Sequence, residues 1–113
     1  MMAIKHANPG EVFDISSLGN QLKGERTRTL AKTDAIEIIR LVLPAGKEIS
    51  THRVPGQIIV QCIEGRVSFT ALGEDRELQA GRLLYLPPGE PHSVRGMDDS
   101  ALLLTIVQPS TGS

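Results

Sequence analysis

Apolar residues lie along the chain in short runs, and turn-forming residues separate these runs at short intervals. The runs are rich in Ile, Leu and Val, and a turn every ~8–12 residues is typical of antiparallel β-sheets. No stretch has the length and periodicity of a long helix. We therefore expect an all-β domain of about nine or ten strands, folded as a sandwich or barrel. The expected strands begin near Thr27 and continue at residues 35–43, 47–53, 57–63, 66–72, 76–79, 83–86, 92–95 and 101–107.

The same pattern divides the chain into three parts. Residues 1–25 are expected to form an N-terminal arm, with a short strand at 12–15 and a helical turn at 16–22. Residues 26–108 are expected to form the barrel domain, and residues 109–113 a disordered tail. A chain of 113 residues is long enough for one hydrophobic core and too short for two.

Charge and composition narrow the choice of partners and compartment. The net charge is −1 and basic residues are spread along the chain, which argues against nucleic acid or an anionic membrane as a partner. No apolar run approaches the ~20 residues of a membrane-spanning helix, and the N-terminus lacks the apolar stretch of a signal peptide. We therefore expect a cytoplasmic protein. Because Cys62 is the only cysteine, an intramolecular disulfide is excluded.

Residues 81–92, GRLLYLPPGEPH, combine a strand signal with a rigid corner and a histidine. The apolar run at 83–86 predicts a short strand that is buried on both faces. Pro87 and Pro88 cannot donate to a β-ladder, and Gly89 permits a sharp bend, so the strand is expected to end there. The corner places His92 at the mouth of whatever the strands enclose. It is therefore a candidate metal ligand or acid/base group, or else a hydrogen-bonded residue at the rim.

The spacing in this stretch resembles the second motif of the cupin superfamily, G-x5-P-x-G-x2-H-x3-N. Gly81, Pro87, Gly89 and His92 match it, and Gly96 stands where the motif has asparagine. The resemblance implies the cupin fold, a double-stranded β-helix or jelly-roll barrel. It extends over about two thirds of the chain, from residue 36 to residue 107.

Residues 46–65 resemble the first cupin motif, G-x5-H-x-H-x3,4-E-x6-G, only in part. Gly46, His52 and Gly65 match. Val54 stands where the second histidine belongs, and Ile58 where the glutamate belongs. This half-retained motif supports the fold more strongly than it supports the chemistry of the family.

A metal-binding cupin presents three histidines and one glutamate, so the resemblance leaves this chain two of the four ligands, His52 and His92. A divalent ion at a catalytic site usually has three or more protein ligands. Two readings remain: one divalent ion (Fe, Mn, Ni or Zn) held by His52 and His92, or no cofactor. In the second, the two imidazoles hydrogen-bond to water, to neighbouring groups or to a ligand. The loss of two ligands favours the second reading.

The expected ligand pocket is mostly apolar, with the two histidines as its polar groups. Three further polar residues are candidates for its lining. Gln57 is expected to point out of the barrel unless a bulge turns it inward. Cys62 is expected to be a small buried core residue. Arg40 would bind an anionic ligand if it faced the interior, and such an arginine is more often at a sheet surface or in an intersubunit ion pair. The expected pocket residues are His52, Val54, Ile58, Val60, Leu86 and His92.

The outward face of the strand at 57–63 is also expected to be apolar, because it carries Ile59 and Ile63. A sheet that is apolar on both faces needs a cover on both, and a second subunit can supply one. We therefore expect a homodimer. The leading function is the binding of a small, largely apolar metabolite. The alternatives are a metal-dependent oxygenase or isomerase that uses His52 and His92, and a structural or regulatory dimer module with a vestigial pocket.

Overall fold

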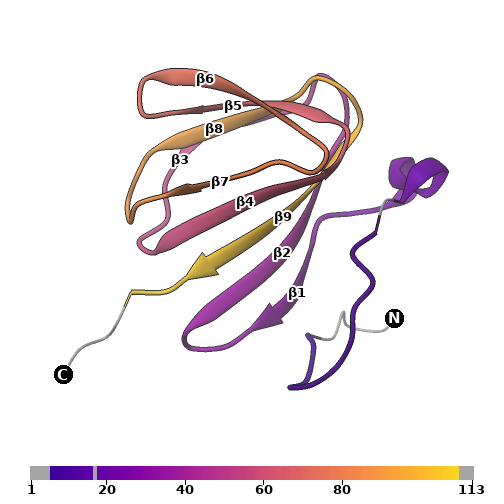
Figure 1. The fold of residues 1–113 in the computed structure, drawn as a ribbon, viewed down its shortest axis with the longest axis vertical. Helices are drawn as coiled ribbons and strands as arrows, with labels where there is room; N and C mark the ends of the chain where they lie inside the picture. The colour runs from indigo at the N-terminus through magenta and orange to yellow at the C-terminus, as the bar shows by residue number, and fades with distance from the viewer. Residues whose placement is uncertain (1–5, 17, 110–113) are drawn as a thin grey trace.

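The structure, a computed structural model, describes residues 6–16 and 18–109, and within them the chain forms two antiparallel β-sheets that pack face to face (Figure 1). The all-β architecture predicted from the sequence is confirmed. One short 3-10 helix, η1, precedes the strands in the described part of the chain. The elements are η1 (Gly19–Gly24), β1 (Arg28–Lys32), β2 (Ile36–Leu43), β3 (Glu48–His52), β4 (Gln57–Glu64), β5 (Arg66–Ala71), β6 (Glu74–Gln79), β7 (Leu83–Leu86), β8 (His92–Gly96) and β9 (Ser100–Val107).

The chain crosses repeatedly between the two sheets. One sheet has the strand order β1-β2-β9-β4-β7, and the other has the order β3-β8-β5-β6. Strands that are neighbours in space are therefore often distant in sequence, as when β9 lies between β2 and β4. The same topology brings β3 beside β8, so that the two stretches with motif-like spacing meet in one sheet.

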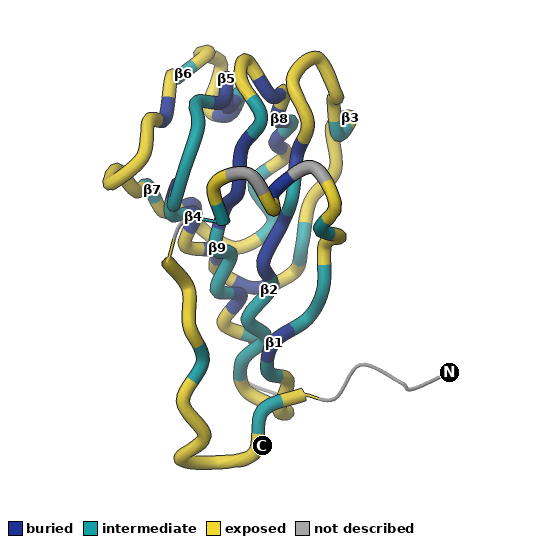
Figure 2. Tube along the Cα trace, turned by 90° about the vertical axis from the view of Figure 1, so that its right-hand side faces the viewer, coloured by how far each residue is buried: buried dark blue, intermediate teal, exposed yellow. Residues whose placement is uncertain are grey.

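Alternating side chains explain how the strands build the core. In β4, Ile58, Val60 and Cys62 are buried, whereas Gln57 before them and Ile59 between the first two are exposed. The same alternation buries every second residue of β5. Because successive side chains of a strand point to opposite faces, each sheet turns one apolar face toward the other. The buried stretches in Figure 2 follow this pattern along the central strands.

The N-terminal arm differs from the expectation. The short strand expected at residues 12–15 is absent, and Val12 is 92% exposed. The backbone on either side of this segment bonds locally, because Asn8 N donates to the Glu11 carboxylate and Ser16 N donates to that of Asp14. Such local side-chain bonds compete with a β-ladder.

The expected helical turn lies further along the chain than predicted, at Gly19–Gly24 rather than 16–22. The carboxylate of Glu64, at the end of β4, explains its position. It accepts hydrogen bonds from the backbone N–H groups of Leu18 (2.6 Å) and Gly19 (3.2 Å), which fixes the start of η1 on the barrel. Within the described ranges, no helix is long and apolar enough to cross a membrane. Ser17 and most of the expected tail, residues 110–113, lie outside those ranges.

Strand β7 was expected to be buried on both faces, and this is wrong for one of them. Leu86 is buried, but Leu83 and Tyr85 are 60% and 69% exposed. The reason is the topology: β7 is an edge strand of the five-stranded sheet, and no segment among the described residues of the single chain buries its outward side chains. A run of four apolar residues does not distinguish one buried face from two.

The β5–β6 hairpin is tighter than the expected turn at residues 73–75. Its two-residue loop is Leu72-Gly73, and both residues have positive φ, 55° and 78°. This is the backbone of a type I′ turn, whose twist matches that of the flanking strands. Strand β6 consequently begins at Glu74, two residues earlier than predicted.

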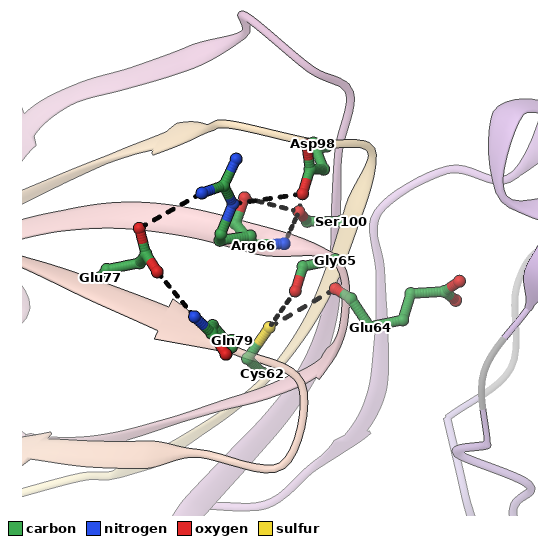
Figure 3. A network of polar contacts seen from close by, with 8 residues as sticks. All are labelled: Cys62, Glu64, Gly65, Arg66, Glu77, Gln79, Asp98 and Ser100. Carbon is green, nitrogen blue, oxygen red and sulfur yellow. Dashed lines mark hydrogen bonds and ion pairs between the residues drawn. The ribbon is translucent and has the colours of Figure 1, made fainter.

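Gly65 forms the corner between β4 and β5, and a polar network surrounds it (Figure 3). Its φ is +80°, and an added Cβ would collide with the Asp99 carbonyl oxygen and with Ser100. The Ser100 hydroxyl accepts a hydrogen bond from Arg66 N (2.9 Å), and its side chain is completely buried. Arg66 in turn forms ion pairs with Glu77 (3.5 Å) and Asp98 (3.3 Å). The corner thus joins the two sheets through backbone contacts that only glycine permits.

Candidate ligand-binding site

A cavity of about 160 Å³ lies between the two sheets, and the two sheets contribute different chemistry to it. The wall from the five-stranded sheet is entirely aliphatic and comes from β2, β4 and β9. The wall from the four-stranded sheet carries both histidines and a phenylalanine. The lining residues are Thr27, Ile39, Leu41, Ile49, His52, Ile58, Val60, Phe69, His92, Val94, Leu102 and Leu104.

His52 and His92 form the polar end of the cavity. They are direct cross-strand partners at the paired ends of β3 and β8. Their ring centroids are 4.4 Å apart, and the ring of His92 also stacks on Phe69 at 5.5 Å. His92 is only 4% exposed, whereas His52 is exposed at the rim. The pair therefore spans the distance from the solvent to the interior.

Backbone carbonyls determine the proton positions of both rings. His52 Nδ1 lies 3.0 Å from the carbonyl oxygen of Ser50, and His92 Nδ1 lies 2.9 Å from that of Glu90. A carbonyl oxygen only accepts hydrogen bonds, so Nδ1 must carry the proton in each neutral ring. Nε2 of each ring then has a free lone pair. The site therefore presents two hydrogen-bond acceptors beside an apolar cavity.

Burial lowers the pKa of His92 below its ordinary value of 6.5, because the charged ring loses its hydration. The nearby His52 lowers it further, while the hydrogen bond to the Glu90 carbonyl and the charge of the Glu90 carboxylate act in the opposite direction. The net direction is downward. His92 is thus held in the neutral form that accepts a hydrogen bond through Nε2.

This shift predicts a loss of stability in acid. Between pH 6.5 and the lower folded-state pKa, the unfolded chain binds the His92 proton and the folded chain does not. The stability that depends on neutral His92 is therefore fully present above pH 6.5. As the pH falls below 6.5, the free energy of unfolding decreases by at most about 1.4 kcal/mol per pH unit. Denaturant unfolding at a series of pH values should show a shallower acid slope for His92→Gln than for the wild type.

The exposed His6 provides the control, because His6→Gln removes a histidine outside the barrel core. That variant is expected to keep the wild-type slope. Equal slopes for the wild type and His92→Gln would contradict the assignment of the acid-sensitive term to this ring.

The structure brings four of the six predicted pocket residues together around the cavity: His52, Ile58, Val60 and His92. The other two do not line it. Leu86 is buried in the core cluster toward the edge of the sheet. Val54 packs against that cluster in the loop after β3, and its carbonyl oxygen accepts a hydrogen bond from Gly89 N (2.9 Å).

Sequence reasoning missed the aromatic member of the site and most of the aliphatic wall. Phe69 lies on β5, outside both motif-like stretches, and only the alternation along that strand signals that it faces inward. Ile39 and Leu41 lie on β2, which has no such alternation, because all its residues except Glu37 and Arg40 are apolar. The sequence motifs did not mark these residues as part of a site, and the structure places them around the cavity.

The three additional polar residues lie away from the cavity. Gln57 is exposed on the outer face of the sheet, as expected. Cys62 is completely buried, and its thiol donates weakly to the carbonyl oxygens of Glu64 (3.4 Å) and Gly65 (3.7 Å), as Figure 3 shows. Desolvation raises the pKa of this thiol, which makes it a poor nucleophile. Its side chain belongs to the core cluster.

Arg40 points away from the cavity, since its neighbours Ile39 and Leu41 line the cavity and side chains alternate along a strand. It is buried on the outer face of the sheet and forms an ion pair with Glu25 (3.6 Å). The interior position that would let it bind an anionic ligand is therefore not the one observed. Its role is to attach the segment after η1 to the sheet.

The residues of the site do not form a metal centre of the usual kind. His52 and His92 offer two imidazole ligands, and in residues 6–16 and 18–109 no group of three or more His, Cys, Asp or Glu side chains is arranged to hold an ion. The cavity wall opposite the histidines is aliphatic and supplies no oxygen donor. Two imidazoles alone fall short of the donor set that a catalytic divalent ion requires.

Two other hollows lack comparable chemistry. One, of about 230 Å³, is polar and lies on the outer face of the four-stranded sheet, where the strand hydroxyls and charges are solvated. The other, of about 200 Å³, lies beside η1 and is lined by Leu22, Val42, Pro44 and Asp99. Neither is lined by a histidine. The cavity between the sheets is therefore the candidate site.

Comparisons with known proteins agree with this geometry. A family model described as a cupin domain matches residues 39–107. A conserved protein of unknown function from Streptococcus pyogenes has a similar structure, with a TM-score of 0.75 and 25% identity over 98% of both chains. A cupin superfamily protein from Desulfitobacterium hafniense has a TM-score of 0.71 and 18% identity over 74% of this chain and 76% of its own.

The fold is also found in an enzyme. A DMSP lyase from Ruegeria pomeroyi has a TM-score of 0.67 and 22% identity over 88% of this chain and 54% of its own. The search of curated proteins found no match. These likenesses confirm the jelly-roll barrel predicted from the two motif-like stretches. They do not choose an activity, because one fold serves many functions.

Proposed function

The chain belongs to the cupin domain family, and on that premise we propose that its barrel binds a small, largely apolar molecule between the two sheets. The observation that carries this proposal is the cavity of about 160 Å³ between the sheets, with a single polar end. Small-molecule sites are typically concave and apolar, with a few polar groups that orient the ligand. Here the two histidines would orient it, and the aliphatic wall would select its size.

The wall opposite the histidines supports binding rather than chemistry on the ligand. It contains only aliphatic side chains, and the lining has no carboxylate, thiol or amine. A bound molecule would be held by dispersion and by the removal of its apolar surface from water, which contributes about 25 cal/mol per Å². Since Val54 and Ile58 replace the second histidine and the glutamate of a metal-binding cupin, the proposal uses no metal ion.

Filling the cavity should abolish binding. Leu104→Phe adds bulk from β9 on the cavity side, and we expect it to remove the chemical-shift changes that single-ring compounds cause in the methyl groups of Ile58 and Leu102. Leu103→Phe is the matched control, because the adjacent side chain on the same strand points to the outer face. Binding that survives in Leu104→Phe, or is lost equally in both variants, would place the ligand elsewhere.

We also propose that the protein is a homodimer whose interface is the outer apolar face, defined by Ile59, Leu83, Tyr85 and Val107. All four side chains lie on one face of the five-stranded sheet and are at least 38% exposed. The face also carries Gln57, Gln61 and Thr105 between them, and none of these is charged. In a two-fold dimer this face of one subunit contacts the same face of the other. Because the patch is apolar and uncharged, the contact brings no like charges together.

A further inference from the structure

The polar groups of the cavity restrict the chemistry of its ligand. Three lining residues have polar side chains: Thr27, His52 and His92. The Thr27 hydroxyl is already engaged, because it accepts a hydrogen bond from Val42 N (2.9 Å) and lies 3.4 Å from Val42 O. Only the two imidazoles remain to contact a ligand.

Both imidazoles offer the ligand an acceptor and neither offers a donor. Their Nδ1 protons are donated to the carbonyl oxygens of Ser50 and Glu90, so Nε2 of each neutral ring carries a lone pair. His52 is exposed, and water can satisfy its Nε2 at the rim. His92 is almost completely buried and stacked on Phe69. Its Nε2 is not among the buried atoms that lack a partner, so it faces the cavity, and water or a ligand there supplies its partner.

The size of the cavity limits the rest of the molecule to about one ring. An apolar cavity of ~150 Å³ lined by Leu, Ile and Phe side chains holds one benzene molecule. The cavity here has about the same volume and a similar lining. Phe69 and the aliphatic wall give such a ring apolar contacts on both sides.

We propose that the ligand is a neutral hydroxyl compound, a phenol or alcohol whose apolar body is about one ring in size and whose O–H donates to His92 Nε2. This inference rests on the proposed function and names the ligand class of the same cavity. The hydroxyl is a small neutral group that donates a hydrogen bond while adding little polar surface to an apolar site.

Other polar groups fit the same cavity less well. Ethers, ketones and esters have only acceptors, which would face the lone pairs of the imidazoles. A carboxylate has the same fault and also carries a charge that no cation in the lining balances. An ammonium group would donate well, but the lining has no carboxylate to balance its charge.

Three isomers provide the test: 4-methylphenol, benzyl alcohol and anisole. They have the same atoms and nearly the same volume, and only the first two donate a hydrogen bond. Phenols are un-ionised at neutral pH, since the phenol of tyrosine has a pKa of about 10. We expect NMR titration at neutral pH, with benzoate as a fourth compound, to give dissociation constants about tenfold lower for 4-methylphenol than for anisole.

Removing the acceptor should remove this selectivity. In His92→Leu the ratio between anisole and 4-methylphenol is expected to fall to about one, while the wild-type ratio persists in His6→Leu, which alters a histidine outside the cavity. His92→Met is the alternative variant if leucine impairs folding, because methionine fills irregular gaps and has no nitrogen acceptor. If neither variant folds, the ratio of the two dissociation constants in the wild type alone tests whether the ligand must donate a hydrogen bond.

The outcomes separate this inference from the proposed function. If anisole binds as tightly as 4-methylphenol, or benzoate binds more tightly than either, the cavity is a ligand site, but the proposal that its ligand donates a hydroxyl to His92 is overturned. If none of the four compounds binds, the proposed function itself fails for ligands of this size. Loss of 4-methylphenol binding after treatment with a chelator would also overturn the inference, because the hydroxyl would then be bound to a metal ion.

Discussion

Gly65→Ala is expected to lower the free energy of unfolding by about 3 kcal/mol or more, a large part of the ~5–15 kcal/mol that stabilises a typical domain. Two costs combine. The left-handed backbone, with φ of +80°, disfavours any residue with a Cβ by about 1–2 kcal/mol. The new methyl group would also collide with the backbone of residues 99 and 100, which cannot move without disturbing the buried bonds between Ser100 and Arg66.

Gly73→Ala separates the two costs. Gly73 has nearly the same φ, +78°, but an added Cβ there would have no neighbour within 4 Å. This variant is expected to lose only the backbone term, about 1–2 kcal/mol. Chemical denaturation of both variants measures the difference. Equal losses would show that the corner at Gly65 relaxes without cost, and that the close approach between the β4–β5 corner and residues 99–100 is not needed for stability.

Ile59→Lys is expected to dissociate the proposed homodimer. Ile59 lies near the centre of the outer apolar face, directly opposite Tyr85 on the neighbouring strand. In a two-fold interface each substitution occurs twice, so two ammonium groups would be buried close together against apolar surface. Opposing like charges cost several kcal/mol, which corresponds to an increase of about 100-fold or more in the dissociation constant.

Sedimentation equilibrium at micromolar concentration measures this change. The wild type is expected to sediment as a dimer and Ile59→Lys as a monomer. Leu72→Lys is the control, because Leu72 is an exposed apolar residue (53%, against 38% for Ile59) at the β5–β6 hairpin of the other sheet. A monomeric wild type would contradict the proposal. Dissociation by Leu72→Lys but not by Ile59→Lys would move the interface to the four-stranded sheet.

The strands were largely predictable because their signals are local. Strand β4 begins at the predicted residue, since Gln57 follows a Pro-Gly turn and the alternation after it is strong. The proximity of His52 and His92 could also be predicted, because the resemblance to two family motifs implies that their histidines share one end of a barrel. These features depend on a few residues each, at known spacings.

What remained hidden depends on contacts between distant segments. The inward position of Phe69 depends on which strands stack across the barrel, and no local motif marks it. The exposure of Tyr85 follows from β7 being an edge strand, which is a property of the whole topology. The start of η1 depends on the carboxylate of Glu64, about 45 residues away along the chain. Such long-range effects override local propensity.

The division of the cavity between the two sheets has a consequence for how its selectivity can change. The groups that hold the polar end of a ligand come from β3 and β8, whereas the wall that limits its bulk comes from β2, β4 and β9. Exchanges such as Val60→Ala or Leu104→Val would reshape the space for the ring while the imidazoles keep their backbone anchors. Substitutions can therefore change the preferred size of the ligand and its preferred polar group independently. Relatives with this barrel can differ in one preference and keep the other.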